Sequence, residues 1–260
     1  MTNLPEPLID FSPAAQQLEQ RLQALDRAWQ RFEAELQAGK VARNSLEAMR
    51  VELTYNSNAI EGNTLSLRET QLVLEGISPP GGKNLKEIYV ARNHDTAFGK
   101  VETWIAERPP HDALTLQDLL DIHKIVMRDI DPAAGGLRTG RVLIKGTRFV
   151  PPGGHPFDEL IPAMLDLANR TRGLHPAIQA AELHYNFVAI HPFSDGNGRT
   201  ARLLMNYWLM QRRFPVTIID VADRAEYLNT LELANKGDCV PFASFVANCI
   251  EHSIHRLIGE

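Results

Sequence analysis

Cysteine is scarce in this sequence, because its 260 residues include only Cys239 and Cys249. Two cysteines without a Cys-x-x-Cys spacing supply neither a disulfide framework nor a typical zinc site. We therefore predict that both are reduced thiols in the core of a cytoplasmic protein. A disulfide between them is the less favoured alternative.

Long hydrophobic runs are also absent. No apolar stretch approaches the roughly 20 residues that a membrane-spanning helix requires. The N-terminus has neither the basic region nor the apolar region of a signal peptide. Positive charge is not in excess either, since the formal net charge is −5, whereas general nucleic-acid-binding domains are usually basic. We expect neither a membrane nor a nucleic acid as a partner.

Amphipathic helices account for most of the chain, because apolar residues recur every three or four positions. Ser66 with Glu69 matches a capping box, and Gly76 matches a helix end. The clearest break lies at residues 79–82, which read Pro-Pro-Gly-Gly. The pattern predicts helices over residues 18–36, 46–60, 66–76, 85–104, 115–122, 159–171, 176–189, 199–210, 224–235 and 241–257.

One region departs from the helical pattern. Arg141–Ile144 and Arg148–Val150 are short apolar stretches that flank Lys145-Gly146-Thr147. Such an arrangement is typical of a β-hairpin with a glycine-containing turn. The sequence therefore predicts an all-α fold that carries one β-hairpin.

Residues 191–202 are the most informative stretch and read His-Pro-Phe-Ser-Asp-Gly-Asn-Gly-Arg-Thr-Ala-Arg. Gly196 and Gly198 lack a Cβ, so the backbone can come close to a ligand. The predicted helix that follows presents unpaired N–H groups and a positive dipole end, which favour an anion. Arg199 and Arg202 lie near its first turn, and each can fork onto phosphate oxygens. The stretch therefore predicts a polyphosphate site.

The same stretch contains a candidate base and a candidate metal ligand. His191 is the only group in it that can accept a proton near neutral pH; a structural histidine packed beside Phe193 is the plainer alternative. Asp195 suits a phosphate site if a cation lies between them, and Mg²⁺ is the usual choice. Asn197 alone would be interpreted as a helix cap. A zinc site that includes His184 lacks a zinc-type spacing.

This stretch resembles the signature of the Fic family, His-x-Phe-x-(Asp/Glu)-Gly-Asn-Gly-Arg-x-x-Arg, at every specified position. The resemblance implies a helical Fic core with a β-hairpin flap over residues 81–260, preceded by an N-terminal helical region, residues 1–80. It implies a protein adenylyltransferase, which transfers AMP from ATP to a Ser, Thr or Tyr hydroxyl of a target protein. His191 would be the base and Asp195 the Mg²⁺ ligand. The implied ATP-binding residues are Gly196, Asn197, Gly198, Arg199, Arg202, Tyr227 and Asn235.

The resemblance also assigns a role to the predicted hairpin. Fic flaps align target segments by strand addition, and the candidate contacts here are Thr147, Arg148, Phe149 and Val150. The adenine site is less regular, because Leu228 stands where the family leads us to expect another tyrosine. This departure leaves the stacking partner open, and a purely structural Tyr227 is an equal alternative.

Residues 57–62 read Ser-Asn-Ala-Ile-Glu-Gly and will be called the inhibitory segment. Taken alone, they indicate a helix that stops at Gly62 with Glu61 facing solvent. They also resemble the Fic inhibitory motif, (Ser/Thr)-x-x-x-Glu-(Gly/Asn), with Ser57, Glu61 and Gly62 at the specified positions. The resemblance implies that Glu61 pairs with Arg202, repels the γ-phosphate and leaves the α-phosphate misplaced. Some relatives with this glutamate also remove AMP, so Glu61 could instead align a water molecule for that reaction.

Several alternatives stay open at this point. Relatives that phosphorylate their targets have lysine at the position of Gly198, so this glycine argues against a kinase. A donor of UMP or phosphocholine would use the same loop. A nucleotide-binding module without turnover is the alternative from a different class. The sequence identifies neither the target protein nor the oligomeric state, although relatives commonly form homodimers.

Overall fold

The computed structural model describes residues 4–79, 82–144, 147–153, 157–170 and 173–259. Regular structure in these residues is helical, and no β-strand occurs among them. The helices are α1 (Ser12–Gln17), α2 (Glu19–Gln37), α3 (Arg43–Ile60), α4 (Leu67–Leu74), α5 (Leu85–Glu107), α6 (Leu116–Val126), α7 (Phe157–Asn169), α8 (Pro176–Ile190), α9 (Asn197–Met210), the 3-10 helix η1 (Val221–Asp223), α10 (Arg224–Ala234) and α11 (Val240–Ile258).

Several helix ends follow directly from their local sequence. Ser66 and Glu69 form the predicted capping box at the start of α4, and Thr115 forms another at the start of α6. Gly62 and Gly76 have φ values of +95° and +81° just beyond α3 and α4. Because only glycine takes this left-handed conformation without a Cβ penalty, both residues end their helices as predicted.

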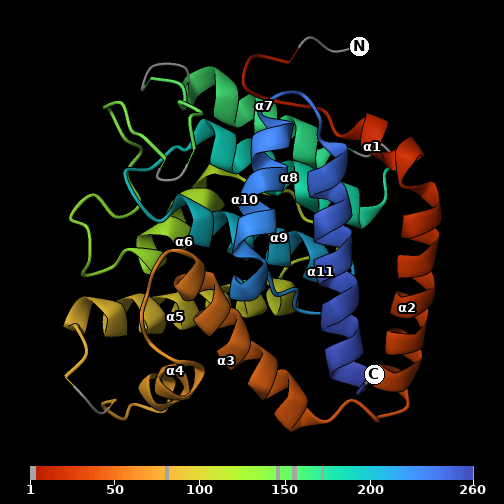
Figure 1. Cartoon of the computed structure of the whole chain (residues 1–260), viewed down its shortest axis with the longest axis vertical. Helices are drawn as coiled ribbons and strands as arrows, with labels where there is room; N and C mark the ends of the chain where they lie inside the picture. The colour runs from red at the N-terminus through yellow and green to blue at the C-terminus, as the bar shows by residue number, and fades with distance from the viewer. Residues whose placement is uncertain (1–3, 80–81, 145–146, 154–156, 171–172, 260) are drawn as a thin grey trace.

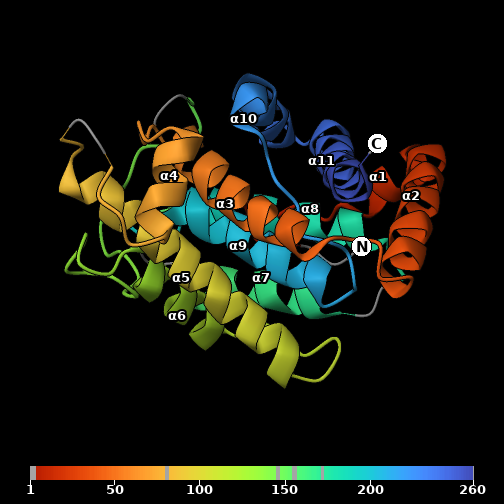
Figure 2. The same ribbon diagram turned by 90° about the horizontal axis from the view of Figure 1, so that it is seen from below.

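Helix α9 lies at the centre of the molecule and packs against α8, α5, α6 and α3 (Figures 1 and 2). Helix α8 is buried on nearly all sides, as expected for a helix that is apolar around its circumference. Helix α2 packs along α11 at one edge of the molecule. The loop between α8 and α9 therefore joins the two most deeply buried helices, which hold it firmly.

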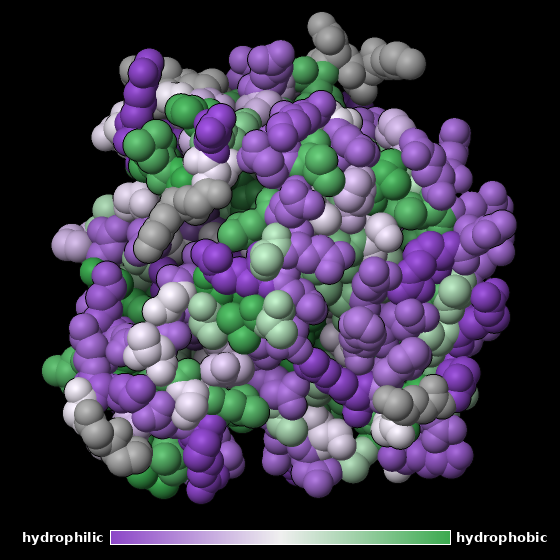
Figure 3. Space-filling model, viewed as in Figure 1, coloured by the Kyte–Doolittle hydropathy of each residue, from purple (hydrophilic) through white to green (hydrophobic). Residues whose placement is uncertain are grey.

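One hydrophobic core extends through most of the chain. It includes Phe11 and Leu25 near the N-terminus, Phe187 in α8 and Ile250 in α11. The predicted boundary between residues 80 and 81 lies outside the described residues, and the division into two domains stays a prediction. On the face shown in Figure 3, hydrophilic residues predominate and hydrophobic side chains form small groups.

The predicted hairpin is the main difference from the sequence-based fold. Its predicted arms, Arg141–Ile144 and Arg148–Val150, have no strand geometry, and two of the three turn residues, Lys145 and Gly146, lie outside the described residues. The N–H of Thr147 donates to the carbonyl of Ile144 at 3.5 Å, so a turn-like contact joins the arms. A short two-stranded hairpin without a third strand is only marginally stable, which explains why apolar arms alone do not produce a ladder.

Two predictions from scarce features can be compared with the structure. Cys239 and Cys249 are free and buried, as predicted for core thiols. Within the described ranges, every helix is too short or too polar to cross a membrane.

Candidate functional site

The loop from His191 to Gly196 joins α8 to α9, and its first and last residues both have a left-handed backbone conformation. His191 ends α8 with φ +51°, and Gly196 caps α9 with φ +78°. A Cβ on Gly196 would lie 2.8 Å from Sδ of Met127. Glycine is therefore required at this position both by the backbone conformation and by the close approach of α6.

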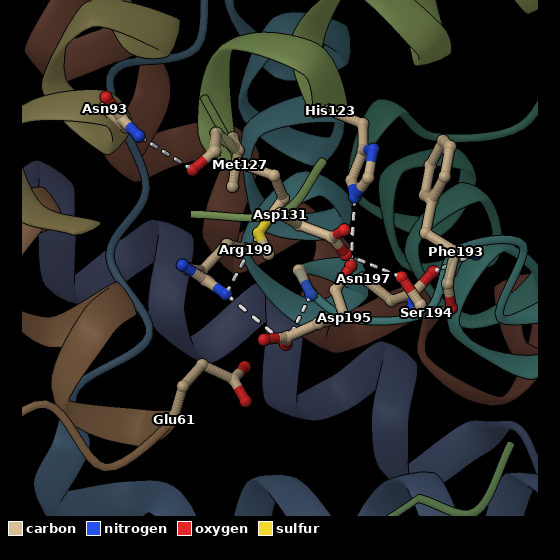
Figure 4. A network of polar contacts seen from close by, with 12 residues as sticks. Glu61, Asn93, His123, Met127, Asp131, Phe193, Ser194, Asp195, Asn197 and Arg199 are labelled. Carbon is tan, nitrogen blue, oxygen red and sulfur yellow. Dashed lines mark hydrogen bonds and ion pairs between the residues drawn. The ribbon is translucent and has the colours of Figure 1, made fainter. Parts of the chain in front are cut away.

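Side chains from two elements brace this loop. Asn197 receives a hydrogen bond from the Phe193 N–H and donates one to the Phe193 carbonyl. The predicted helix cap at Asn197 is thus wrong, because its amide is used within the loop and Gly196 holds the cap position. Phe193 is fully buried and stacks on the His123 ring at 3.5 Å between centroids. Figure 4 shows His123 pointing at the backbone of Asp195, whose carbonyl lies 2.9 Å from His123 Nε2.

His191 is arranged as a neutral base. Its Nδ1 lies 3.2 Å from the carbonyl of Val188. Because a carbonyl can only accept, Nδ1 carries the proton and Nε2 keeps its lone pair. Burial, with a smaller contribution from the charge of Arg138, lowers the pKa of His191 to about 4, against the raising effect of its bond to Val188. The imidazole is therefore neutral at physiological pH and can accept a proton.

Two buried arginines follow the loop on α9. Arg199 and Arg202 are 4% and 2% exposed. Nε and one terminal nitrogen of Arg199, and one terminal nitrogen of Arg202, have no hydrogen-bond partner among the described residues. Burial lowers the pKa of Arg199, with Asp195 and Glu61 opposing this effect. Buried cationic donors that lack partners are costly, so this end of α9 is suited to an anion.

Arg202 is held by the inhibitory segment. It donates to Oγ and the carbonyl of Ser57 at 2.9 and 2.7 Å, and to Oε1 of Glu61 at 2.8 Å. A Cβ added to Gly198 would collide with the same Glu61 oxygen. The Glu61 carboxylate therefore lies against the start of α9, where it occupies part of the anion site; Figure 4 shows it extending toward the loop that carries Asp195.

A cavity of about 710 Å³ opens beside these groups. Glu61, His191 and Gly198 line one part of it. Helix α10 lines another part through Tyr227, and Asn235 follows that helix. Distant parts of the sequence thus meet at one cavity that is large enough for a nucleotide-sized ligand.

The two residues predicted to contact adenine differ in exposure. Tyr227 is 3% exposed, and its hydroxyl lies 3.2 Å from Nε2 of His184. It therefore both lines the cavity and packs in the core. Asn235 is less buried and accepts a hydrogen bond from the Tyr185 hydroxyl at 3.2 Å. His184 is fully buried, as expected for a packing residue.

Residues 147–150, which we call the docking segment, border the same cavity. Thr147, Arg148 and Phe149 line it, while Val150 is 58% exposed. The Thr147 hydroxyl donates to the Glu232 carboxylate at 2.6 Å, which fastens the segment to α10. The structure thus brings the predicted target-contacting residues to the rim of the cavity, without a strand.

The contacts and exposure of Asp195 suit a cation ligand. One carboxylate oxygen accepts from the N–H of Gly196 at 2.6 Å and lies 3.4 Å from Arg199. Its side chain is 59% exposed, so a cation could reach it from solvent. Mg²⁺ often takes only one or two protein carboxylates together with substrate phosphates, and Asp195 fits that use. Among the described residues, no group of three or more His, Cys, Asp or Glu side chains could hold a metal, so the zinc alternative gains no support.

Sequence patterns did not identify three residues that shape the site. Arg138 donates to the carbonyl of His191 at 2.6 Å, Arg224 donates to the carbonyl of Ile60 at 2.8 Å, and His123 supports the loop. Arg138 and Arg224 bind backbone carbonyls, which every residue has, so no partner in the sequence could have revealed them.

Comparisons with known proteins agree with this geometry. A family model described as "Fic/DOC family" matches residues 113–209. Protein adenylyltransferase Fic of Culex quinquefasciatus is 38% identical over 207 residues, which is 78% of this chain and 41% of that protein. Protein adenylyltransferase fic-1 of Caenorhabditis elegans is 39% identical over 208 residues, 79% of this chain and 40% of that protein. The chain thus spans less than half the length of these curated relatives.

Solved structures give the same result. A Fic-1 fragment from C. elegans superposes with a TM-score of 0.82 at 33% identity, covering 93% of this chain and 72% of that one. A Fic family protein from Desulfovibrio desulfuricans superposes with a TM-score of 0.79 at 26% identity, covering 98% and 77%.

Proposed function

The chain belongs to the Fic/DOC family, and on that premise we propose that it is a protein adenylyltransferase that transfers AMP from ATP to a hydroxyl of a target protein. One observation carries this proposal. A neutral histidine with a free Nε2 lines a cavity together with Gly198, at the start of the helix that carries the buried Arg199 and Arg202. A base beside a phosphate site is what hydroxyl attack on a phosphoryl group requires.

His191 performs the proton transfer in the proposed reaction. Its Nε2 takes the proton from a Ser, Thr or Tyr hydroxyl of the target. The hydroxyl oxygen forms a bond to the α-phosphorus, the bond from the α-phosphorus to the bridging oxygen breaks, and pyrophosphate leaves. General-base catalysis of this kind contributes roughly 10²–10⁴ in rate.

The start of α9 stabilises the negative charge. Arg199, Arg202 and the backbone N–H groups of Asn197 and Gly198 offer donors to the phosphate oxygens, while the Gly196 N–H donates to Asp195. Asp195 would hold Mg²⁺, which neutralises charge on the α- and β-phosphates when it is bound. No covalent intermediate on the protein is needed, because positioning and electrostatics suffice for phosphoryl transfer.

Glu61 inhibits this reaction in our proposal. Its carboxylate occupies one arm of the Arg202 guanidinium, where a γ-phosphate would otherwise bind. Like charges at this distance repel, so ATP would bind with its α-phosphate out of line for attack. The inhibited arrangement is supported by the present contacts of Glu61.

Removal of AMP is a second candidate reaction at the same cavity. Glu61 and His191 both line it, and the Glu61 side chain is 43% exposed. The carboxylate could orient a water molecule onto a bound phosphodiester while His191 protonates the departing hydroxyl oxygen. Glu61→Gly should then lose AMP removal as it gains AMP transfer; retained removal by that variant would exclude this role.

Label transfer from ATP tests the main proposal. The wild type, Glu61→Gly and Glu61→Gly/His191→Ala are incubated with Mg²⁺, a cell lysate and ATP labelled at the α- or the γ-phosphate. We expect label only from the α-phosphate, strong with Glu61→Gly and absent with the double variant. Label from the γ-phosphate would indicate a kinase. No label with ATP still bound would favour a UMP or phosphocholine donor, or a binding module without turnover.

A further inference from the structure

Arg138 lies between the loop of His191 and the stretch that contains the docking segment. It is 7% exposed, and no acidic side chain pairs with it among the residues that the structure describes. An uncompensated buried cation is costly unless its donors find other acceptors. The groups that accept hydrogen bonds from Arg138 therefore explain why an arginine occupies this position.

Among the residues that the structure describes, the guanidinium donates only to backbone carbonyls. Nε donates to His191 at 2.6 Å, and one terminal nitrogen donates to Gly140 at 2.6 Å. The other terminal nitrogen donates to Pro152 at 2.7 Å and to Ile190 at 3.2 Å. The N–H of Arg138 adds a bond to the Pro192 carbonyl at 2.9 Å. One residue thus binds three consecutive carbonyls at the end of α8 and both ends of the stretch from 140 to 152.

Two properties of this place favour a cation with a planar fork. The last carbonyls of a helix lack partners within the helix and carry partial negative charge. His191 also has φ +51°, a conformation that is unfavourable for a residue with a side chain. Several directed donors on a rigid plane can hold that backbone in place, whereas a lysine ammonium is a single point of charge.

We propose that Arg138 is a positioning residue of the transfer reaction, which fixes the backbone of His191 and at the same time anchors the stretch that carries the docking segment. Arg138 acts through His191 and through the carbonyls of Gly140 and Pro152, and it does not line the cavity. Alignment of the base and presentation of the target hydroxyl therefore depend on one side chain. This inference rests on the proposed adenylyltransferase function.

The test compares Arg138→Lys and Arg138→Ala in the Glu61→Gly background. A misplacement of about 1 Å can reduce a rate by roughly 10², so we expect kcat to fall at least about tenfold in both variants. KM for the target should rise, while the Kd for ATP should change much less than kcat, because the guanidinium of Arg138 bonds residues 140, 152, 190 and 191 and not the donors of α9. Arg108→Lys is the matched control: Arg108 is half-buried and binds Asp118 at 2.6 Å and Tyr207 at 3.3 Å, in contacts remote from the cavity.

A second measurement does not need activity. Amide hydrogen exchange should increase together in residues 140–144, 147–153 and 191–196 of Arg138→Lys, because one side chain holds them all. Unchanged kcat and unchanged exchange in Arg138→Lys would overturn the proposal. If Glu61→Gly itself transferred no AMP, the proposed function would fail; an increase in exchange confined to either stretch would separately contradict the linkage.

Discussion

The inhibitory segment and the docking segment border the same cavity, but they are held in very different ways. Arg202 donates three hydrogen bonds to the inhibitory segment, and Arg224 fastens the carbonyl of Ile60. Within the described part of the chain, the docking segment has one side-chain bond to the rest of the site, from Thr147 to Glu232. Val150 in that segment is largely exposed, whereas Ser57 is almost fully buried.

This difference indicates which of the two segments is preorganised before a ligand or target binds. The inhibitory segment extends a long helix that packs on the core, so its geometry is set before any ligand binds. The docking segment keeps backbone groups available to a partner, as strand addition would require. Under the proposed function, the resting protein would therefore be organised for inhibition, and the target would complete its own binding site.

Removing the Glu61 carboxylate should have the largest effect on the difference between the inhibitory segment and the docking segment. The Glu61–Arg202 bond is charge-assisted, but the Glu61 side chain is half-exposed. We therefore expect the bond to stabilise the inhibited arrangement by about 1–2 kcal/mol. Glu61→Gly should therefore raise the rate of AMP transfer by roughly tenfold or more. Glu61→Gln is the matched control, since it keeps the size and loses the charge. Initial rates of label transfer measure both; equal rates for Gly and wild type would contradict the inhibitory role.

Acid should destabilise the fold through two buried histidines, of which His94 contacts α3, the helix that carries the inhibitory segment. Burial lowers the pKa of His94 to about 3, with the charges of Arg202 and Arg199 adding to it, and burial lowers the pKa of His184 to about 3. Both pKa values lie below the usual 6.5. Between about pH 3 and pH 6.5, therefore, these histidines bind protons in the unfolded chain but not in the folded chain. Stability is present above pH 6.5 and falls as pH drops toward 3, by about 1.4 kcal/mol per pH unit for each histidine that stays neutral.

Urea unfolding between pH 7 and 4.5 measures this loss of stability. His94 lies 3.3 Å from Thr54 of α3 through Nδ1, so hydrogen exchange at the end of α3 should increase before global unfolding. The exposed His111 provides a control variant, His111→Gln, that should leave the pH dependence as it is. A stability that is flat over this pH range would refute the prediction.

Loosening α3 outside the cavity should release inhibition partially. Asn56 accepts a hydrogen bond from the N–H of Val221 at 2.9 Å, and Asn56→Ala removes it. We expect a loss of about 1 kcal/mol in stability and a severalfold rise in transfer. Asn169→Ala is the matched control, because Asn169 bonds the backbone of Leu114 away from the cavity. Asn169→Ala should lose stability without any gain in AMP transfer. A similar gain in both variants would contradict the view that α3 specifically maintains the inhibition.

The smallest effect should come from the docking segment. Thr147→Val keeps the shape and removes the bond to Glu232, so KM for the target should rise by a few-fold while inhibition and stability stay nearly unchanged. Thr103→Val, in an exposed part of α5, should change none of these quantities. A large loss of stability in Thr147→Val would mean that the docking segment is as firmly built as the inhibitory one.

The helices were predictable because their causes are local. Apolar periodicity, the Ser66 capping box and the glycines at 62 and 76 all act within a few residues. The signature loop was also predictable, and the pairing of Glu61 with Arg202 followed from the resemblance. The predicted hairpin shows the limit of such patterns: its described arms form no strand, since two apolar arms form a ladder only if tertiary contacts support them.

The residues that support the loop between α8 and α9 were not predictable, because their partners are distant in the sequence and form no recognisable pattern. Arg138 binds carbonyls of residues 140, 152, 190 and 191, and His123 stacks on Phe193 from another helix. The side chain of Asn197 turned to the Phe193 backbone, although its position at a helix start favoured a cap. Each of these contacts depends on the packing of α6, α8 and α9, which only the folded chain defines.

The position of Glu61 on the same chain as Arg202 has a consequence for dosage. A tethered inhibitor acts at an effective concentration, commonly in the millimolar range, that does not change when the protein is diluted or overproduced. If Glu61 inhibits as proposed, making more of this protein would multiply inhibited molecules rather than active ones. An activating signal would then have to separate Glu61 from Arg202 in each molecule, and a higher protein concentration alone would not activate it.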